Sequence, residues 1–177
     1  MLHPISLRRG RLILRHLTIV LAVALSTAIA VSPAAAAKPI QTTFTYSFTG
    51  FPVIGICAFP ISLDGIVNIS QTDFTDSSGA LTRSRSHVVQ QDTFYANGKT
   101  LLGSPYTFNA EILFDDSGTM THFFASGVIE KIPLPDGSLF IAAGRVDFLN
   151  HPGPTFVLSP DKGNPGDVAK FCGALAP

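Results

Sequence analysis

The chain has 177 residues, of which 12 are Lys or Arg and 12 are Asp or Glu, so its formal net charge is zero. Residues 38–177 carry 8 basic against 12 acidic side chains, a net charge of −4. This balance excludes the strongly basic classes that bind nucleic acid or anionic lipid. The 140 residues after position 37 are enough for one domain with a hydrophobic core.

The first 37 residues have the layout of a secretory signal peptide. Four arginines lie between residues 8 and 15, an apolar run covers 17–31, and the alanines at 34–37 offer small-residue cleavage sites. The apolar run is shorter than the roughly 20 residues of a membrane span, although an uncleaved signal anchor is an alternative. We predict a cleaved signal peptide at 1–37 and a secreted, extracellular domain at 38–177 without a membrane span.

Only two cysteines occur, Cys57 and Cys172. In an oxidising compartment such a pair predicts a disulfide, here closing a loop of 115 residues. Loop entropy gives about 4–5 kcal/mol for a bridge of this span. A redox role is the alternative, but no C-x-x-C motif is present. The bond would fasten a C-terminal tail that would otherwise fray.

From residue 38 onward, alternating apolar and polar residues predict strands, and Asp-, Asn- and Gly-containing turns separate them. Within this pattern we expect Phe44, Tyr46, Phe48, Phe140, Val146 and Phe148 to point inward. A short helix is expected at 165–171, with Asn164 as its cap. The expected strands are 41–49, 60–64, 66–75, 80–95, 100–114 with a break at 103–105, 119–132, 138–149 and 154–159.

Successive hairpins predict an all-β, antiparallel fold of about seven or eight strands. Closure into a single β-barrel of lipocalin or dirigent size would remove the exposed edges, and the 14 Phe with no Trp would fill its interior. A two-sheet β-sandwich is the alternative.

Several segments resemble a group of small secreted actinobacterial proteins of unknown function. They are CAFP, LPDGS, AAGRVDFL, HPGPTFVLSPDKGNPGD and the terminal FCGAL, and the C-terminal region is the most similar. The resemblance implies a secreted β-domain with this cysteine pair. It supplies no catalytic residues.

Motifs of known chemistry are missing. The sequence has no G-x-S-x-G, H-E-x-x-H, P-loop or G-x-G-x-x-G, and its histidines lack metal-ligand spacing. We therefore predict no cofactor, no metal and no catalytic residue. His122 and Glu130 share a predicted strand face, but eight residues separate them by roughly 26 Å, too far for an acid–base pair.

The candidate binding residues are Arg83, Arg85 and His87, which alternate with serines on one strand, together with Glu111. Three cationic or titratable groups in a row could hold a carboxylate or phosphate. The alternative, which we favour, is a solvated outer face, with Ser84, Ser86 and Val88 inward.

These observations predict an uncharacterised secreted β-barrel that binds a small apolar or amphipathic ligand without catalysis. One alternative is a cofactor-free barrel enzyme of the cyclase or isomerase type, and another is a cell-envelope interaction module. A deep apolar pocket favours a binder, whereas convergent polar groups in a pocket favour an enzyme.

Overall fold

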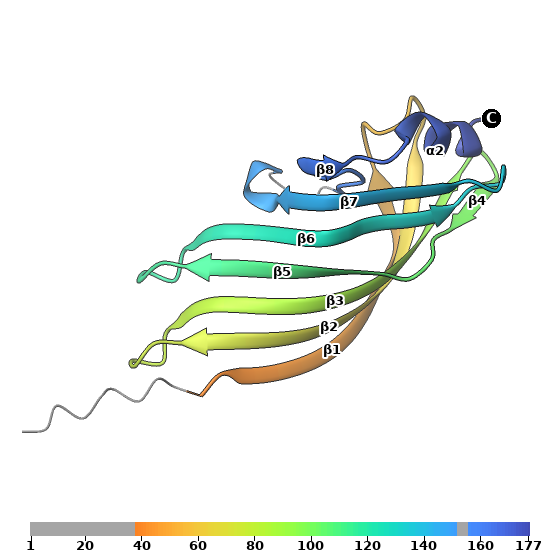
Figure 1. Ribbon diagram of the computed structural model, residues 1–177. Coiled ribbons are helices and arrows are strands. Elements are labelled where there is room, and N and C mark those ends of the chain that lie inside the picture. Colours follow the sequence, from red (N-terminus) through yellow and green to blue (C-terminus); the bar gives the residue numbers. More distant parts are fainter. Residues whose placement is uncertain (1–37, 152–155) are drawn as a thin grey trace, which may run out of the picture. The chain divides into compact units, whose positions relative to one another are not determined.

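The structure is a computed structural model that describes residues 38–151 and 156–177; the expected signal peptide lies outside these residues. An eight-stranded antiparallel sheet, the 3-10 helix η1 and the C-terminal helix α2 make up the fold (Figure 1). The elements are β1 (Ile40–Val53), β2 (Ile61–Thr75), β3 (Leu81–Ala96), β4 (Lys99–Leu102), β5 (Tyr106–Phe114), β6 (Met120–Pro133), β7 (Leu139–Asp147), η1 (Phe148–Asn150), β8 (Lys162–Asn164) and α2 (Val168–Leu175).

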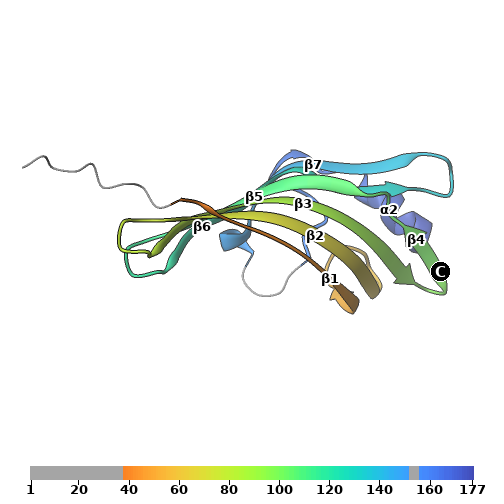
Figure 2. The ribbon, with the colours of Figure 1, turned by 90° about the horizontal axis from the view of Figure 1, so that it is seen from below.

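The sheet is open, with the strand order β1-β2-β3-β5-β6-β7-β8 and with β4 paired to β3. The all-β antiparallel prediction is confirmed, but the closed barrel is not found, because the edge strands β1 and β8 do not pair with each other. A two-sheet sandwich is not found either, since all the described strands belong to one sheet. The sheet is curved (Figure 2). β8 has only three residues and pairs with β7, and Phe156 and Leu158, which precede it, pack in the hydrophobic core.

Four hairpin turns form where the sequence predicts them, and three of them have the same pattern of hydrogen bonds. Asp76, Asp115 and Asp136 each accept hydrogen bonds from the backbone N–H and the hydroxyl group of the serine two residues later. The fourth turn joins β3 to β4 through Asn97 and Gly98, whose φ angles of 51° and 74° are those of a tight two-residue hairpin. The residues within each turn therefore determine where the chain reverses direction.

Four predicted elements differ from the structure. The strands expected at 60–64 and 66–75 are one continuous strand, β2, which passes through Gly65. The described residues of the segment expected as a strand at 154–159 are irregular, and a short strand follows at β8 instead. Helix α2 begins after Asp167, whose carboxylate accepts the backbone N–H of Lys170 at 3.0 Å, so Asn164 is not its cap.

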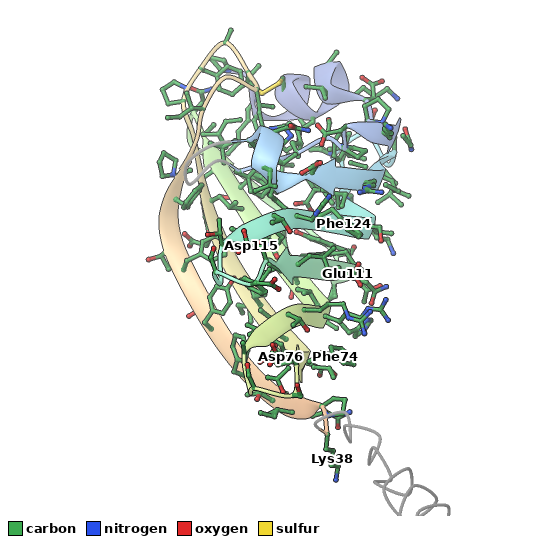
Figure 3. The ribbon with its side chains drawn as sticks, turned by 90° about the vertical axis from the view of Figure 1, so that its left-hand side faces the viewer. Lys38, Phe74, Asp76, Glu111, Asp115 and Phe124 are labelled. Carbon is green, nitrogen blue, oxygen red and sulfur yellow. A yellow bond between two sulfur atoms is a disulfide. The ribbon has the colours of Figure 1, made fainter. Side chains whose placement is uncertain are left out.

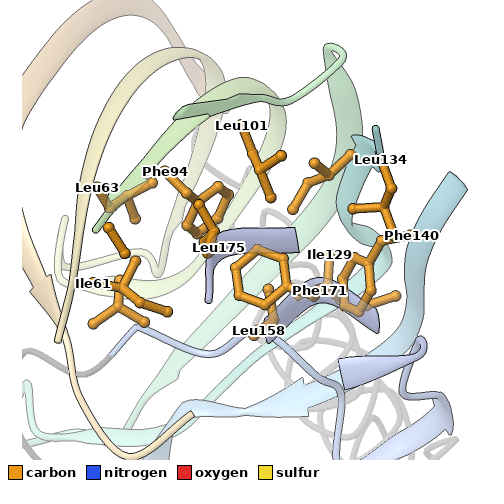
Figure 4. Close-up of a cluster of buried hydrophobic side chains, with 14 of the residues drawn as sticks. Ile61, Leu63, Phe94, Leu101, Ile129, Leu134, Phe140, Leu158, Phe171 and Leu175 are labelled. Carbon is orange, nitrogen blue, oxygen red and sulfur yellow. The ribbon is translucent and has the colours of Figure 1, made fainter. Parts of the chain in front are cut away.

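The hydrophobic core lies at one end of the sheet, where α2 packs against the strands (Figure 4). Phe171 of α2 is fully buried, and its ring centroid lies 5.1 Å from that of Phe94 and 5.5 Å from that of Phe140. The predicted disulfide is confirmed: Cys57 and Cys172 are bonded, with their Cα atoms 5.6 Å apart, and the bond appears in yellow in Figure 3. It fastens α2 to the loop between β1 and β2.

The side chains that we expected to point inward differ in how deeply they are buried. Phe140 and Val146 are buried in the core, and Phe48 and Phe148 are partly buried against it. Phe44 and Tyr46 of β1 pair with the groove residues Ile69 and Val67 and so lie on the inner face, but they remain 41% and 48% exposed. Their strand is an edge of an open sheet, and no closing strand arrives to cover them. Among the described residues, no helix is long and apolar enough to cross a membrane.

Candidate ligand-binding groove

Beyond the core, the same face of the sheet is hollowed into a groove with a volume of about 350 Å³. Its lining is largely aliphatic and aromatic, and none of the described residues in it has a charged side chain. A volume of this size lies at the lower end of the range for small-molecule sites. The lining residues are Tyr46, Val67, Ile69, Gln71, Ser86, Val88, Gln90, Tyr106, Phe108, Ala110, Ile112, Phe123, Ala125, Ile129, Phe148, Phe156 and Val157.

Small residues in one row across the sheet form the floor of the groove. Ser86 on β3 lies opposite Ala110 on β5, which in turn lies opposite Ala125 on β6. The next row on one side contains Phe108, and the next row on the other side contains Phe123. Because side chains on one face of a sheet stand about perpendicular to it, a row of short side chains between rows of long ones leaves a hollow.

The chain after β7 supplies one wall of the groove. The ring of Phe148 in η1 packs on Phe123, with 4.6 Å between the centroids. Phe156 packs edge-on against the core residue Phe94 at 5.6 Å, so the wall is continuous with the core. The groove therefore lies between the covered end of the sheet and its uncovered end.

A group of polar side chains is buried below the inner end of the groove. The hydroxyl group of Tyr106 donates to a carboxylate oxygen of Asp92 at 2.6 Å, and the amide nitrogen of Gln90 lies 3.0 and 2.9 Å from the two oxygens of that carboxylate. Gln90 and Tyr106 line the groove, whereas Asp92 is fully buried. Burial raises the pKa of Asp92 above its ordinary value of 3.8, while the hydrogen bonds from Tyr106 and Gln90 act to lower it.

A second carboxyl group, that of Glu130, lies beside Asp92 and is also fully buried. One of its oxygens accepts the backbone N–H of Lys131 at 2.9 Å, and the other has no hydrogen-bond partner in the part of the chain that the structure describes. Burial raises the pKa of Glu130 well above its ordinary value of 4.5, and the charge of Asp92 raises it further. The two carboxyl groups and Tyr106 thus form a buried acidic cluster behind the groove.

Glu130 faces inward because β6 contains a bulge. The pairing of β6 with β7 slips between Val128 and Glu130, so Ile129 and Glu130 are both buried although they are consecutive. His122, which precedes the bulge, is exposed. The prediction that His122 and Glu130 share one face is therefore wrong, because it assumed an unbroken alternation along the strand.

The four candidate binding residues lie together on the opposite, outer face of the sheet. Arg85 forms an ion pair with Glu111 at 2.6 Å, and His87 makes a hydrogen bond of 3.1 Å with Asn109. The guanidinium group of Arg83 stacks 4.1 Å above the ring of Phe74. Figure 3 shows Phe74 and Glu111 projecting from this outer side of the sheet.

Their placement separates the predicted cationic row from the groove. Ser84 and Val88, which alternate with these residues, are buried on the inner face, and Ser86 lines the groove floor. The side chain of Arg85 remains 57% exposed despite its ion pair. The outer face has a polar hollow of about 640 Å³, which Arg85, His87 and Glu111 line with their side chains already partnered, and the inner face has the apolar groove.

Within the residues that the structure describes, no three His, Cys, Asp or Glu side chains gather as a metal site would require. Sequence reasoning missed Gln90, Asp92 and Tyr106. The signal was present, because Gln90 and Asp92 alternate with the buried Phe94 and must share its face. The burial of Glu130 depends on the bulge and had no comparable signal.

Neither a family model, nor a curated protein, nor a solved structure matches this chain. The resemblance to secreted actinobacterial proteins therefore stays a prediction, and the groove is interpreted from its own chemistry.

Proposed function

We propose that this protein binds one small amphiphilic molecule in the groove on the inner face of its sheet. The observation that supports the proposal most is the contrast between the two ends of that face. At one end, α2 covers the sheet and fills it with Phe171 and Leu175. At the other end, an apolar surface of similar composition is left open as a groove. A hollow that is lined by apolar side chains gains free energy when an apolar body fills it.

A second candidate function is that of a cofactor-free enzyme of the cyclase or isomerase type. The buried acidic cluster favours it, since raised pKa values often mark acid–base groups. However, a catalytic acid must reach the reacting atom within hydrogen-bond distance. Asp92 and Glu130 do not line the groove, although Tyr106 and Gln90, which are bonded to Asp92, do. Binding without catalysis is therefore the function that we put first.

We also propose that the protein acts outside the cell. The disulfide between Cys57 and Cys172 supports this location, because such bonds persist in oxidising compartments. Intact mass of the exported protein tests the proposal: a chain that begins near residue 38 supports secretion with cleavage, whereas a chain that retains residues 17–31 indicates a membrane anchor.

The absence of Trp from the chain allows a direct test of the binding function. Phe148→Trp places a single fluorophore in the groove wall, and Phe124→Trp places one on the outer face, where Phe124 lies beneath Arg145. Each variant is titrated with ω-bromododecanol and, separately, with ω-bromododecanoate, below the micelle concentration. A bromine atom quenches Trp fluorescence on contact.

We expect saturable quenching of the Phe148→Trp protein by at least one of the two compounds, and only weak, linear quenching of the Phe124→Trp protein. Far-UV circular dichroism of both variants checks that the sheet is intact. If neither compound quenches the Phe148→Trp protein in a saturable way, or if both variants respond alike, the proposed binding function is wrong.

A further inference from the structure

The polar atoms at the floor of the groove are oriented by carboxylates next to them. Gln90 directs its amide nitrogen to both oxygens of Asp92, and Gln71 directs its amide nitrogen to Asp73, at 2.9 and 3.1 Å from the two oxygens. Because the amide nitrogen lies within hydrogen-bond distance of both carboxyl oxygens in each pair, the NH₂ end of each amide faces the carboxyl group. The carbonyl oxygen of each glutamine then points away from its carboxylate.

These carbonyl oxygens are the free hydrogen-bonding atoms of the groove. In the described part of the chain, no group donates to the Oε1 atom of Gln90 or Gln71. Both Oε1 atoms are accessible to solvent, since neither is a buried atom without a partner. The hydroxyl proton of Tyr106 is committed to Asp92, so this side chain too can only accept from a molecule in the groove. The inner end of the groove, at Gln90 and Tyr106, thus presents acceptors, and the lining hydroxyl groups that can donate freely are those of Ser86 and Tyr46.

The charges around the groove also disfavour an anionic head group. No Lys, Arg or His from residues 38–151 or 156–177 lines it, and the carboxylate of Asp92 lies directly behind Gln90 and Tyr106. The arginines of β3 are on the opposite face, where Arg85 is paired with Glu111 and Arg83 is stacked on Phe74. An anionic head group in the groove would lose water, meet no cation and face a nearby negative charge.

We propose that the groove selects an amphiphile whose head group donates hydrogen bonds and carries no negative charge, such as a primary alcohol. The carbonyl oxygen of Gln90 accepts the hydrogen bond from this head group. This inference rests on the proposed binding function and adds the chemical class of the ligand. The apolar chain would lie over Ala110 and Ala125, between Phe108 and Phe123.

Three ligands that differ only in the head group test the proposal. They are dodecanol, its methyl ether and dodecanoate, each used at about pH 7.5, where the carboxyl group is ionised. Each competes with the bromo compound that quenches the Phe148→Trp protein, so all three affinities come from one assay. The ether keeps the oxygen but cannot donate, and dodecanoate adds the negative charge.

We expect dodecanol to bind several-fold to about tenfold more tightly than its methyl ether, because one hydrogen bond contributes about 1 kcal/mol. We expect dodecanoate to bind at least about tenfold more weakly than dodecanol. In Gln90→Met, which keeps the length of the side chain but lacks the acceptor, the preference for the alcohol over the ether should disappear. The matched Gln71→Met variant, at the outer end of the groove, should keep it.

The outcomes separate the two proposals. If dodecanoate binds as tightly as dodecanol, or if alcohol and ether bind alike, the head-group inference is wrong while the binding function stands. If no compound binds, both proposals fail. The comparison of the three ligands needs no variant at position 90, so it remains decisive even if Gln90→Met does not fold.

Discussion

Replacing Glu130 by Gln should change how the stability of this protein depends on pH. The substitution removes the titrating group but keeps the size of the side chain and an oxygen that can accept the backbone N–H of Lys131. Only one other glutamate exists in the chain, Glu111, which lies on the outer face. Glu111→Gln is therefore a matched control with the same chemical change at a half-buried, ion-paired site on the outer face.

Whether stability rises or falls with pH follows from the direction of the pKa shift of Glu130. The pKa of Glu130 is raised well above 4.5 by burial and by Asp92, so the folded protein keeps this proton at pH values where the unfolded chain has lost it. Stability from this group is fully present below the unfolded pKa and is lost as pH rises toward the folded pKa. With one proton involved, the free energy of unfolding should fall by up to about 1.4 kcal/mol per pH unit in that window.

Urea denaturation of the wild type and the two variants, at pH values from about 4 to 8, measures the effect. The exposed turn residues Asp76, Asp115 and Asp136 have lowered pKa values, so their contribution has the opposite sign and is confined to the acid end; it cancels between wild type and variant. Glu130→Gln should have a smaller downward slope, because only the raised pKa of Asp92 then contributes to it, and Glu111→Gln should keep the slope of the wild type. A parallel slope in wild type and Glu130→Gln would show that Glu130 is not held protonated by the fold.

Three further predictions concern stability, and each is measured by thermal or urea denaturation with circular dichroism. Replacing both Cys57 and Cys172 by Ala should cost up to about 4–5 kcal/mol while the β-sheet spectrum survives, and an unchanged stability would contradict the role of the bond. Phe171→Ala should cost about 3–5 kcal/mol, because it empties the centre of the core, and a cost below about 1 kcal/mol would place the core elsewhere. Arg85→Ala should change stability by no more than about 1 kcal/mol, since its ion pair with Glu111 is largely solvated; a large loss would refute this view of the outer face.

The strands and hairpins could be predicted because their signals are local. Alternation over a few residues identifies a strand, and Asn97-Gly98 or an Asp-x-Ser-Gly turn identifies where the chain reverses. The disulfide was predictable for a different reason, because Cys57 and Cys172 had no other partner.

Closure of the sheet could not be predicted, because it depends on whether the first strand meets the last. The apolar alternation of Phe44 and Tyr46 is the same whether or not a closing strand covers them. Glu130 illustrates the same limit on a smaller scale. Its inward direction is set by a bulge in the pairing of β6 with β7, which the sequence of β6 alone does not reveal. The groove depends on the open sheet and on this bulge, which are both non-local. The sequence pattern therefore indicated an inward direction only for the floor residues on β3.

Nuclear magnetic resonance of the methyl groups tests the central claim most directly, because β2 carries adjacent methyl-bearing residues on its two faces. Val67 lines the groove, and its neighbour Ile66 is exposed on the outer side. On titration with dodecanol, the account predicts saturable shifts and intermolecular nuclear Overhauser effects at Val67, Val88 and Ile112, with Ile66 unaffected. If dodecanol causes no saturable shift at these groove residues, or shifts Ile66 as much as Val67, the protein does not bind an amphiphile in this groove.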